Sequence, residues 1–152
     1  MPTIRVLVET PVPAAKVLEA AHDFSGRRAK IFPAVSTKRL EVHQLKDTSA
    51  DVTEGTRAGP IVNWERCDYD WSEPGALTAT VIDSNVYAFP GSSWKIKATP
   101  RGTGSEVEML WIRDFKRSPR GRIFGVLFGL IGDRIFNKYG REVLENLENL
   151  ED

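Results

Sequence analysis

The chain has 152 residues, 41% of them hydrophobic and 28% charged, and its 21 basic residues balance its 21 acidic ones. This length predicts a single domain over residues 1–152, and the zero net charge argues against a nucleic-acid-binding surface, which needs a basic excess. The one cysteine, Cys67, and the two histidines supply neither a disulfide nor the ligands of a zinc site. Arg5 and Glu9 interrupt the apolar start, so we expect no signal peptide and a cytoplasmic protein. We also expect that the protein uses neither a metal nor a cofactor.

The first part of the chain predicts one strand and one or two short helices. β-Branched residues at 3–9 are typical of a strand, and two prolines end it before a helix near 13–22. Gly26 marks a turn, after which residues 31–33 leave room for at most one more helical turn.

The middle of the chain predicts an antiparallel meander. Six runs of strand-like residues are separated by short turns rich in Gly, Pro and Asp: 36–45, 51–58, 61–72, 76–84, 92–100 and 105–115. In the last run Val107, Met109 and Trp111 alternate with polar neighbours, which places these three side chains on the inner face.

The run 61–72 is harder to orient because both of its faces carry polar residues. One face has Arg66, Asp68 and Asp70; the other has Asn63, Glu65, Cys67, Tyr69 and Trp71. We place the second face inside, because burying three unpaired charges costs far more than burying one.

The last segment predicts a long amphipathic helix. Ser118 and Pro119 form a typical helix start, and apolar residues then recur every three or four positions to Leu150. Five interior glycines would cost ~5 kcal/mol in helix propensity, so tertiary packing must hold this helix. A break near Gly132 and Asp133, giving two helices, is the alternative.

Three sequence segments in this order resemble the START-like, helix-grip superfamily (SRPBCC), and within it the polyketide cyclase/dehydrase and lipid-transport group. They are ETPVPAAKVLEAAHDFS at 9–25, WERCDYDWSEPGAL at 64–77 and SSWKIKATPRGTGSEVEMLW at 92–111. The resemblance implies an α+β fold in which a curved antiparallel sheet of about seven strands wraps a long C-terminal helix. It also implies an apolar cavity between them, but carriers, receptors and cyclases share this fold, so fold alone does not decide the activity.

Candidate cavity residues come from the inner strand faces and from the helix. An empty cavity of ~300 Å³ would cost ~7 kcal/mol, so we expect a ligand, water or large side chains to fill it. The predicted ligand-binding residues are Asn63, Glu65, Tyr69, Trp71, Trp94, Met109, Trp111, Phe124, Gly125 and Phe128.

Glycines and arginines in the last segment suggest two further features. Gly121, Gly125 and Gly129 share a helix face, either to admit a flat apolar ligand or, as we favour, to pack closely on the sheet. The nine apolar residues 123–131 are too few to cross a membrane, although a transient contact stays open. Basic residues at the helix start predict either solvated charges or an anion site, for which the candidates are Arg113, Arg117 and Arg120.

Glu65 and Tyr69 are the weak catalytic candidates, because a carboxyl group in an apolar cavity can move protons. The interpretation we favour is that Glu65 pairs with an arginine or turns outward. Cys67 is interpreted as a small buried residue rather than a nucleophile. Tyr87 and Phe89, in the turn at 85–91, either fold over the cavity or form an exposed patch.

The sequence therefore favours binding or carriage of a small hydrophobic molecule by a monomer or homodimer. A polyketide cyclase or dehydratase using Glu65 and Tyr69 is the first alternative. A protein-interaction module, in which tryptophan side chains fill the cavity, is the second.

Overall fold

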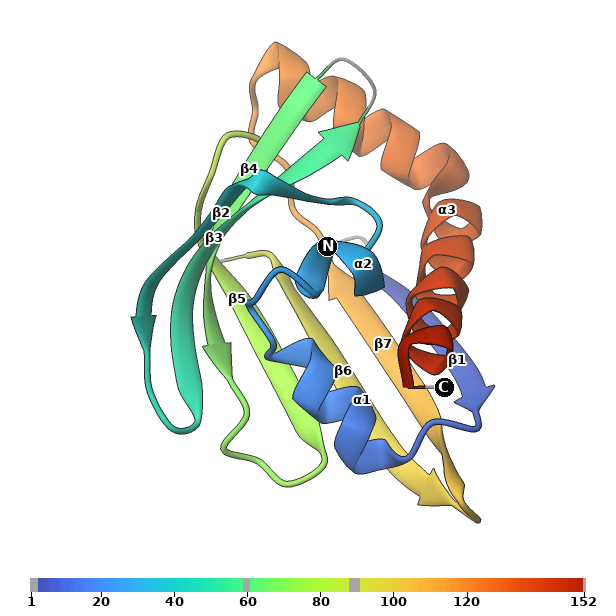
Figure 1. The fold of residues 1–152 in the computed structure, drawn as a ribbon. Coiled ribbons are helices and arrows are strands. Elements are labelled where there is room, and N and C mark those ends of the chain that lie inside the picture. Colours follow the sequence, from blue (N-terminus) through green and yellow to red (C-terminus); the bar gives the residue numbers. More distant parts are fainter. Residues whose placement is uncertain (1–2, 59–60, 88–90, 152) are drawn as a thin grey trace.

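The computed structural model describes residues 3–58, 61–87 and 91–151, which form a curled antiparallel sheet around a long C-terminal helix (Figure 1). This is the predicted α+β helix-grip fold, with two short helices after the first strand. In chain order the elements are β1 (Thr3–Thr10), α1 (Ala14–Ala21), α2 (Arg28–Ile31), β2 (Val35–Leu45), β3 (Ser49–Ala58), β4 (Ile61–Asp70), β5 (Ala76–Ser84), β6 (Ser93–Arg101), β7 (Gly104–Ile112) and α3 (Pro119–Glu151).

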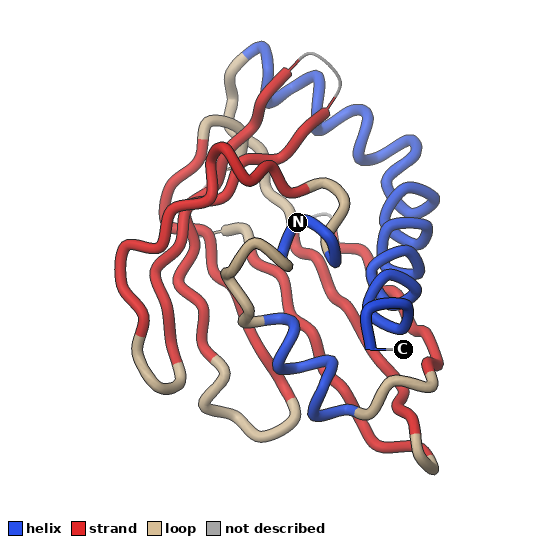
Figure 2. Tube along the Cα trace, in the orientation of Figure 1, coloured by secondary structure: helices blue, strands red, loops and turns tan. Residues whose placement is uncertain are grey.

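The seven strands follow the order β1-β7-β6-β5-β4-β3-β2, so β2 to β7 form the predicted meander. β1 pairs with β7 along its whole length, from Thr3 opposite Ile112 to Thr10 opposite Ser105. The tight β6–β7 turn contains Gly102 at φ +59°, a backbone conformation that glycine adopts without strain. All three helices lie on the concave side of the sheet (Figure 2).

Strand alternation predicted the inner face of β4 correctly as far as Tyr69. Asn63, Cys67 and Tyr69 are buried, whereas Arg66 lies on the opposite face and pairs with Asp51. Trp71 follows directly after the end of β4 and packs, half-buried, against the core, but it is a correction as a ligand-binding residue because it does not reach the cavity. The Trp71 ring instead stacks on His22, with centroids 4.5 Å apart, and its Nε1 donates to the carbonyl of Asp47.

Helix α3 is continuous, without the alternative break at Gly132, but it bends along its length (Figure 1). Its start is capped as predicted, with Gly121 N donating to Ser118 Oγ at 3.0 Å. The C-terminal half is anchored through Val143, Leu144 and Leu147, all of which are buried. The N-terminal half lacks such an anchor and exposes most of its large aliphatic side chains.

The glycines of α3 do not act as their spacing predicted. Gly129 has open space where a Cβ would be, and Gly125 lies against the Phe115 ring rather than the sheet. Close packing on the sheet occurs instead at Gly132 and Gly140. A Cβ at Gly140 would lie 3.1 Å from Val6 Cγ1, so the absence of a side chain lets the helix approach β1.

Candidate ligand cavity

A cavity of about 520 Å³ lies between the concave face of the sheet and α3. Ile123, Leu127 and Ile131 line it and are also 59%, 45% and 43% exposed, so the cavity opens to solvent beside this stretch of helix. At ~24 cal/mol per Å³, a dry cavity of this volume would cost ~12 kcal/mol, as much as the whole stability of many domains. Water or a ligand must therefore occupy it.

Most of the predicted cavity residues meet in this cavity. Those that line it are Asn63, Glu65, Tyr69, Trp94, Met109, Trp111, Phe124 and Phe128. Trp71 and Gly125 do not, because the first lies beyond the end of β4 and the second faces Phe115.

Three polar cavity residues were missed by sequence reasoning: Arg28, Glu54 and Tyr139. Of the two aromatic residues expected either to fold over the cavity or to form an exposed patch, Tyr87 lines the cavity, and Phe89 lies outside the described residues. Glu54 could have been found, because it is two residues from the buried Val52 and so shares its strand face. Arg28 gave no such signal, since its short helix α2 has too few residues for a periodic pattern.

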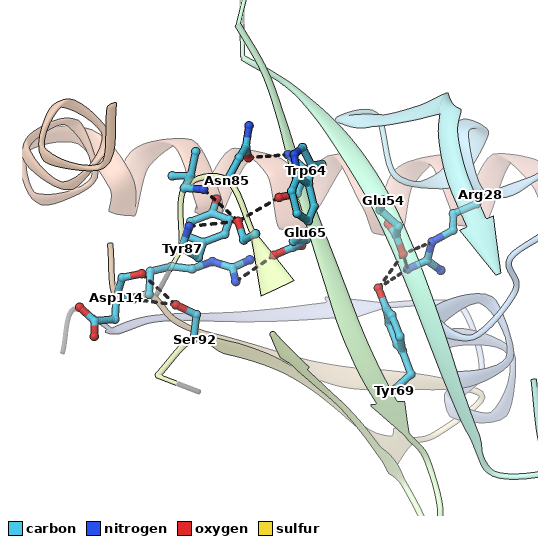
Figure 3. Close-up of polar contacts among 12 residues, drawn as sticks. Arg28, Glu54, Trp64, Glu65, Tyr69, Asn85, Tyr87, Ser92 and Asp114 are labelled. Carbon is cyan, nitrogen blue, oxygen red and sulfur yellow. Dashed lines mark hydrogen bonds and ion pairs between the residues drawn. The ribbon is translucent and has the colours of Figure 1, made fainter. Parts of the chain in front are cut away.

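The first polar cluster in the cavity wall joins Arg28, Glu54 and Tyr69. Arg28 Nε donates to Glu54 Oε1 at 2.9 Å, and the Tyr69 hydroxyl donates to the same oxygen at 2.6 Å. Figure 3 shows these three side chains turned toward one another from α2, β3 and β4. Arg28 Nη1 also donates to the carbonyl of Ala21, which fixes the guanidinium against the first helix. Each partner is thereby held in place by more than one contact.

Burial and charge determine the protonation of this first cluster. Burial opposes the charge on Arg28, but the attraction of Glu54 outweighs it, so the pKa of Arg28 is raised and the cation is kept. Burial, together with the carboxylate of Glu54, raises the pKa of Tyr69 well above its ordinary value. The cluster is thus a fixed ion pair with a neutral phenol, and Tyr69 is a hydrogen-bond donor rather than a base.

The second polar cluster consists of Glu65, Arg113, Asn63 and Tyr87. Arg113 Nη1 lies 3.6 Å from Glu65 Oε2, and the guanidinium carbon lies 4.5 Å from the centre of the Tyr87 ring. Glu65 and Tyr87 are labelled in Figure 3, apart from the first cluster. Within the described residues, four buried atoms here have no hydrogen-bond partner: Asn63 Oδ1, Glu65 Oε2, Arg113 Nε and Arg113 Nη1.

The two clusters lie side by side with balanced charge. Glu54 on β3 is directly opposite Glu65 on β4, and each carboxylate has an arginine of its own. The structure separates the three residues of the predicted anion site. Arg113 faces inward and is paired, whereas Arg117 and Arg120 are exposed and do not line the cavity. The cavity wall therefore offers hydrogen-bonding groups without a net charge.

Burial raises the pKa of Glu65, and the attraction of Arg113 only partly offsets this effect. A carboxyl group whose pKa is higher in the folded state stabilises the fold below its unfolded pKa of ~4.3, and this contribution is lost as pH rises through the folded pKa. The quantity to measure is the difference between the melting temperatures of wild type and Glu65→Gln. We expect this difference to fall as pH rises from ~4 to ~7. The other carboxylates cancel in this difference, so a constant value would contradict the assignment.

Other candidate chemistry is not assembled in the described part of the chain. Among the described residues, no group of three or more His, Cys, Asp or Glu side chains lies close enough together to hold a metal ion. Cys67 is buried, and burial raises the pKa of its thiol well above the ordinary value, so it fits the predicted small core residue. No helix within the described ranges is long and apolar enough to cross a membrane.

A curled sheet gripping a long helix over an apolar cavity defines the class of helix-grip proteins. The model of the family "Polyketide cyclase / dehydrase and lipid transport" matches residues 1–150, and the chain belongs to this family, part of the START-like superfamily. No curated protein matches the chain in sequence.

Solved structures show the same fold at low sequence identity. The protein TTHA0849 from Thermus thermophilus has a TM-score of 0.80 at 14% identity, covering 99% of this chain and 100% of its own. The Zhui aromatase/cyclase from Streptomyces sp. R1128 has a TM-score of 0.78 at 13% identity, with coverages of 99% and 96%. A START superfamily protein from Mycobacterium smegmatis has a TM-score of 0.69 at 10% identity, with coverages of 95% and 98%.

Proposed function

We propose that this protein binds and carries a small hydrophobic molecule in the cavity beneath α3. The observation that carries the proposal is the cavity itself: about 520 Å³, lined mainly by aromatic and aliphatic side chains. Pockets for small molecules have volumes of ~300–1,000 Å³ and a few polar groups that orient the ligand. Trp94 and Trp111 line this space without filling it, which argues against a module that binds no ligand.

The polar wall supports an uncharged ligand with one polar end. Arg28 and Arg113 are already paired with Glu54 and Glu65, so a carboxylate would gain little from them and would meet two acidic groups. The four unpartnered atoms include acceptors on Asn63 and Glu65 and donors on Arg113. A hydroxyl or carbonyl group on an otherwise apolar molecule can satisfy them, which orients the ligand with its apolar part toward the aromatic wall.

The test compares two matched tryptophan substitutions on α3. Leu127→Trp enlarges a side chain that lines the cavity, whereas Leu130→Trp enlarges one that is 75% exposed and does not line it. We expect wild type to bind the neutral probe N-phenyl-1-naphthylamine with a saturable fluorescence increase. Leu127→Trp should weaken this binding about tenfold or more because the indole takes up cavity space. Leu130→Trp should bind like wild type.

Two results would count against carriage. The first is the absence of saturable binding by wild type; the second is an equal loss in both tryptophan variants, which would place the probe outside the cavity. Native mass spectrometry of protein purified without detergent complements the titration, because a co-purified small molecule gives the mass of the natural ligand directly.

A second candidate function is a cyclase or dehydratase, and the carboxyl group of Glu65 favours it. Its raised pKa and its place in the cavity wall suit a group that gives and takes a proton during a reaction. Glu65→Gln separates the two functions. The substitution keeps an acceptor and removes the proton, so a carrier retains its probe affinity, whereas an enzyme loses turnover of its substrate.

A further inference from the structure

The N-terminal half of α3 carries an exposed aliphatic surface, which we call the α3 band. Its five members are 43% to 75% exposed: Ile123, Val126, Leu127, Leu130 and Ile131. Soluble proteins rarely expose several large apolar side chains together on one helix face. Where they do, the face is typically an interaction site. The C-terminal half of the same helix, in contrast, buries Val143, Leu144 and Leu147 against the rest of the fold.

The α3 band is continuous with the cavity mouth but extends beyond it. Ile123, Leu127 and Ile131 line the cavity, whereas Val126 and Leu130 do not and are 62% and 75% exposed. A ligand in the cavity would therefore leave Val126 and Leu130 in water. Exposed apolar side chains that adjoin a cavity mouth in this way are typical of a surface that docks on another one.

Basic residues bracket the α3 band at both ends. Arg117, Arg120 and Arg122 precede it and Arg134 and Lys138 follow it, all exposed. Between residues 115 and 141 the only acidic residue is Asp133. Among the described residues, no ion pair involves Arg117, Arg120 or Arg122. These bases also oppose the helix dipole, which favours negative charge at a helix N-terminus.

We propose that the α3 band docks on the surface of an anionic lipid bilayer. An aliphatic helix face edged by arginines can insert shallowly among acyl chains while its guanidinium groups contact lipid phosphates. Arginine suits this position because its long side chain reaches outward from an apolar helix face. The helix segment that carries the band, residues 123–131, is apolar throughout, but its nine residues are too few to cross a membrane.

A second copy of the chain fits the α3 band less well. In a two-fold dimer centred on the band, antiparallel helices would place Arg120 and Arg122 of one copy opposite Arg134 and Lys138 of the other, and parallel helices would place each basic end opposite its own copy. Like charges at both ends would repel, and the only nearby acid is Asp133. Such a dimer would also close the cavity mouth, whereas a bilayer would face that mouth with apolar chains.

Vesicle sedimentation tests the docking surface. We expect wild type to sediment with vesicles of equal parts phosphatidylcholine and phosphatidylglycerol, and at least tenfold more weakly with phosphatidylcholine alone. The double variant Val126→Glu/Leu130→Glu should lose about tenfold or more of the binding to anionic vesicles. Leu45→Glu is the matched control, because Leu45 is 62% exposed but lies at the end of β2. It should bind like wild type.

The charge requirement is tested with Arg120→Gln/Arg122→Gln, which should lose most of the preference for anionic vesicles and the salt dependence that goes with it. Three results would overturn the proposal: no sedimentation of wild type with anionic vesicles, equal losses in the Leu45 control, or a solution dimer that Val126→Glu/Leu130→Glu dissociates. The last result would assign the band to a second copy. Sedimentation measures membrane docking without a cavity probe, and the probe titration measures ligand binding without vesicles. A failure of one proposal can therefore be told apart from a failure of the other.

Discussion

Replacement of Arg28 by methionine is expected to destabilise the fold by ~3–5 kcal/mol, since it leaves a buried carboxylate without its partner. Arg28 is 1% exposed, and its guanidinium contacts Glu54 and the carbonyl of Ala21. The Tyr69 hydroxyl would remain as a hydrogen-bond donor to Glu54, but a neutral phenol cannot replace the positive charge. Urea denaturation followed by circular dichroism measures the loss.

Two further variants control for this interpretation. Arg66→Met breaks the ion pair between Arg66 and Asp51, whose side chains are 40% and 21% exposed. It should cost far less than Arg28→Met because water screens the exposed pair. Arg28→Met/Glu54→Leu removes both buried charges and should be less destabilised than Arg28→Met alone. If Arg28→Met and Arg66→Met cost the same, burial of the Arg28–Glu54 pair would not be the cause.

The second large effect is expected for Leu147→Ala, which should lower the free energy of unfolding by ~2–5 kcal/mol. Leu147 is 1% exposed and belongs to the group that anchors the C-terminal half of α3. For a domain of this size, the loss corresponds to a fall in melting temperature of roughly 5–15 °C. Differential scanning calorimetry measures both quantities.

Leu130→Ala is the matched control for Leu147→Ala, because the same substitution is made on the same helix at a side chain that is 75% exposed. It should change stability by no more than ~0.5 kcal/mol. A comparable loss in both variants would mean that the N-terminal half of α3 also contributes to the core, and this result would weaken the docking proposal for the α3 band.

Local patterns account for what was predicted well. The period of two along a strand assigned the inner faces of β4 and β7, and turn residues marked the ends of the strands. The resemblance of three segments to the START-like superfamily then indicated how these elements assemble. The local patterns and the resemblance together predicted the fold and eight cavity residues, including Glu65 and Tyr69.

The errors arose where a local pattern was extended past its range. Trp71 was assigned to the cavity by alternation beyond the end of β4, and Gly125 by the four-residue spacing of the glycines, although Gly125 lies against the Phe115 ring. Arg113, Arg117 and Arg120 were grouped by closeness in sequence. The end of β7 turns Arg113 into the cavity, while the other two stay in solvent.

The sequence alone determined the elements of this protein, their order and the inner faces of several strands, because hydrophobic alternation and turn chemistry are properties of neighbouring residues. Only the tertiary structure decided the polar wall of the cavity. The Arg28–Glu54 pair spans α2 and β3, and the Glu65–Arg113 pair joins β4 to the chain after β7. Strand alternation can place a charge such as Glu65 on the inner face, but which arginine pairs with it depends on the distant segment that packs beside it, and no local pattern encodes that.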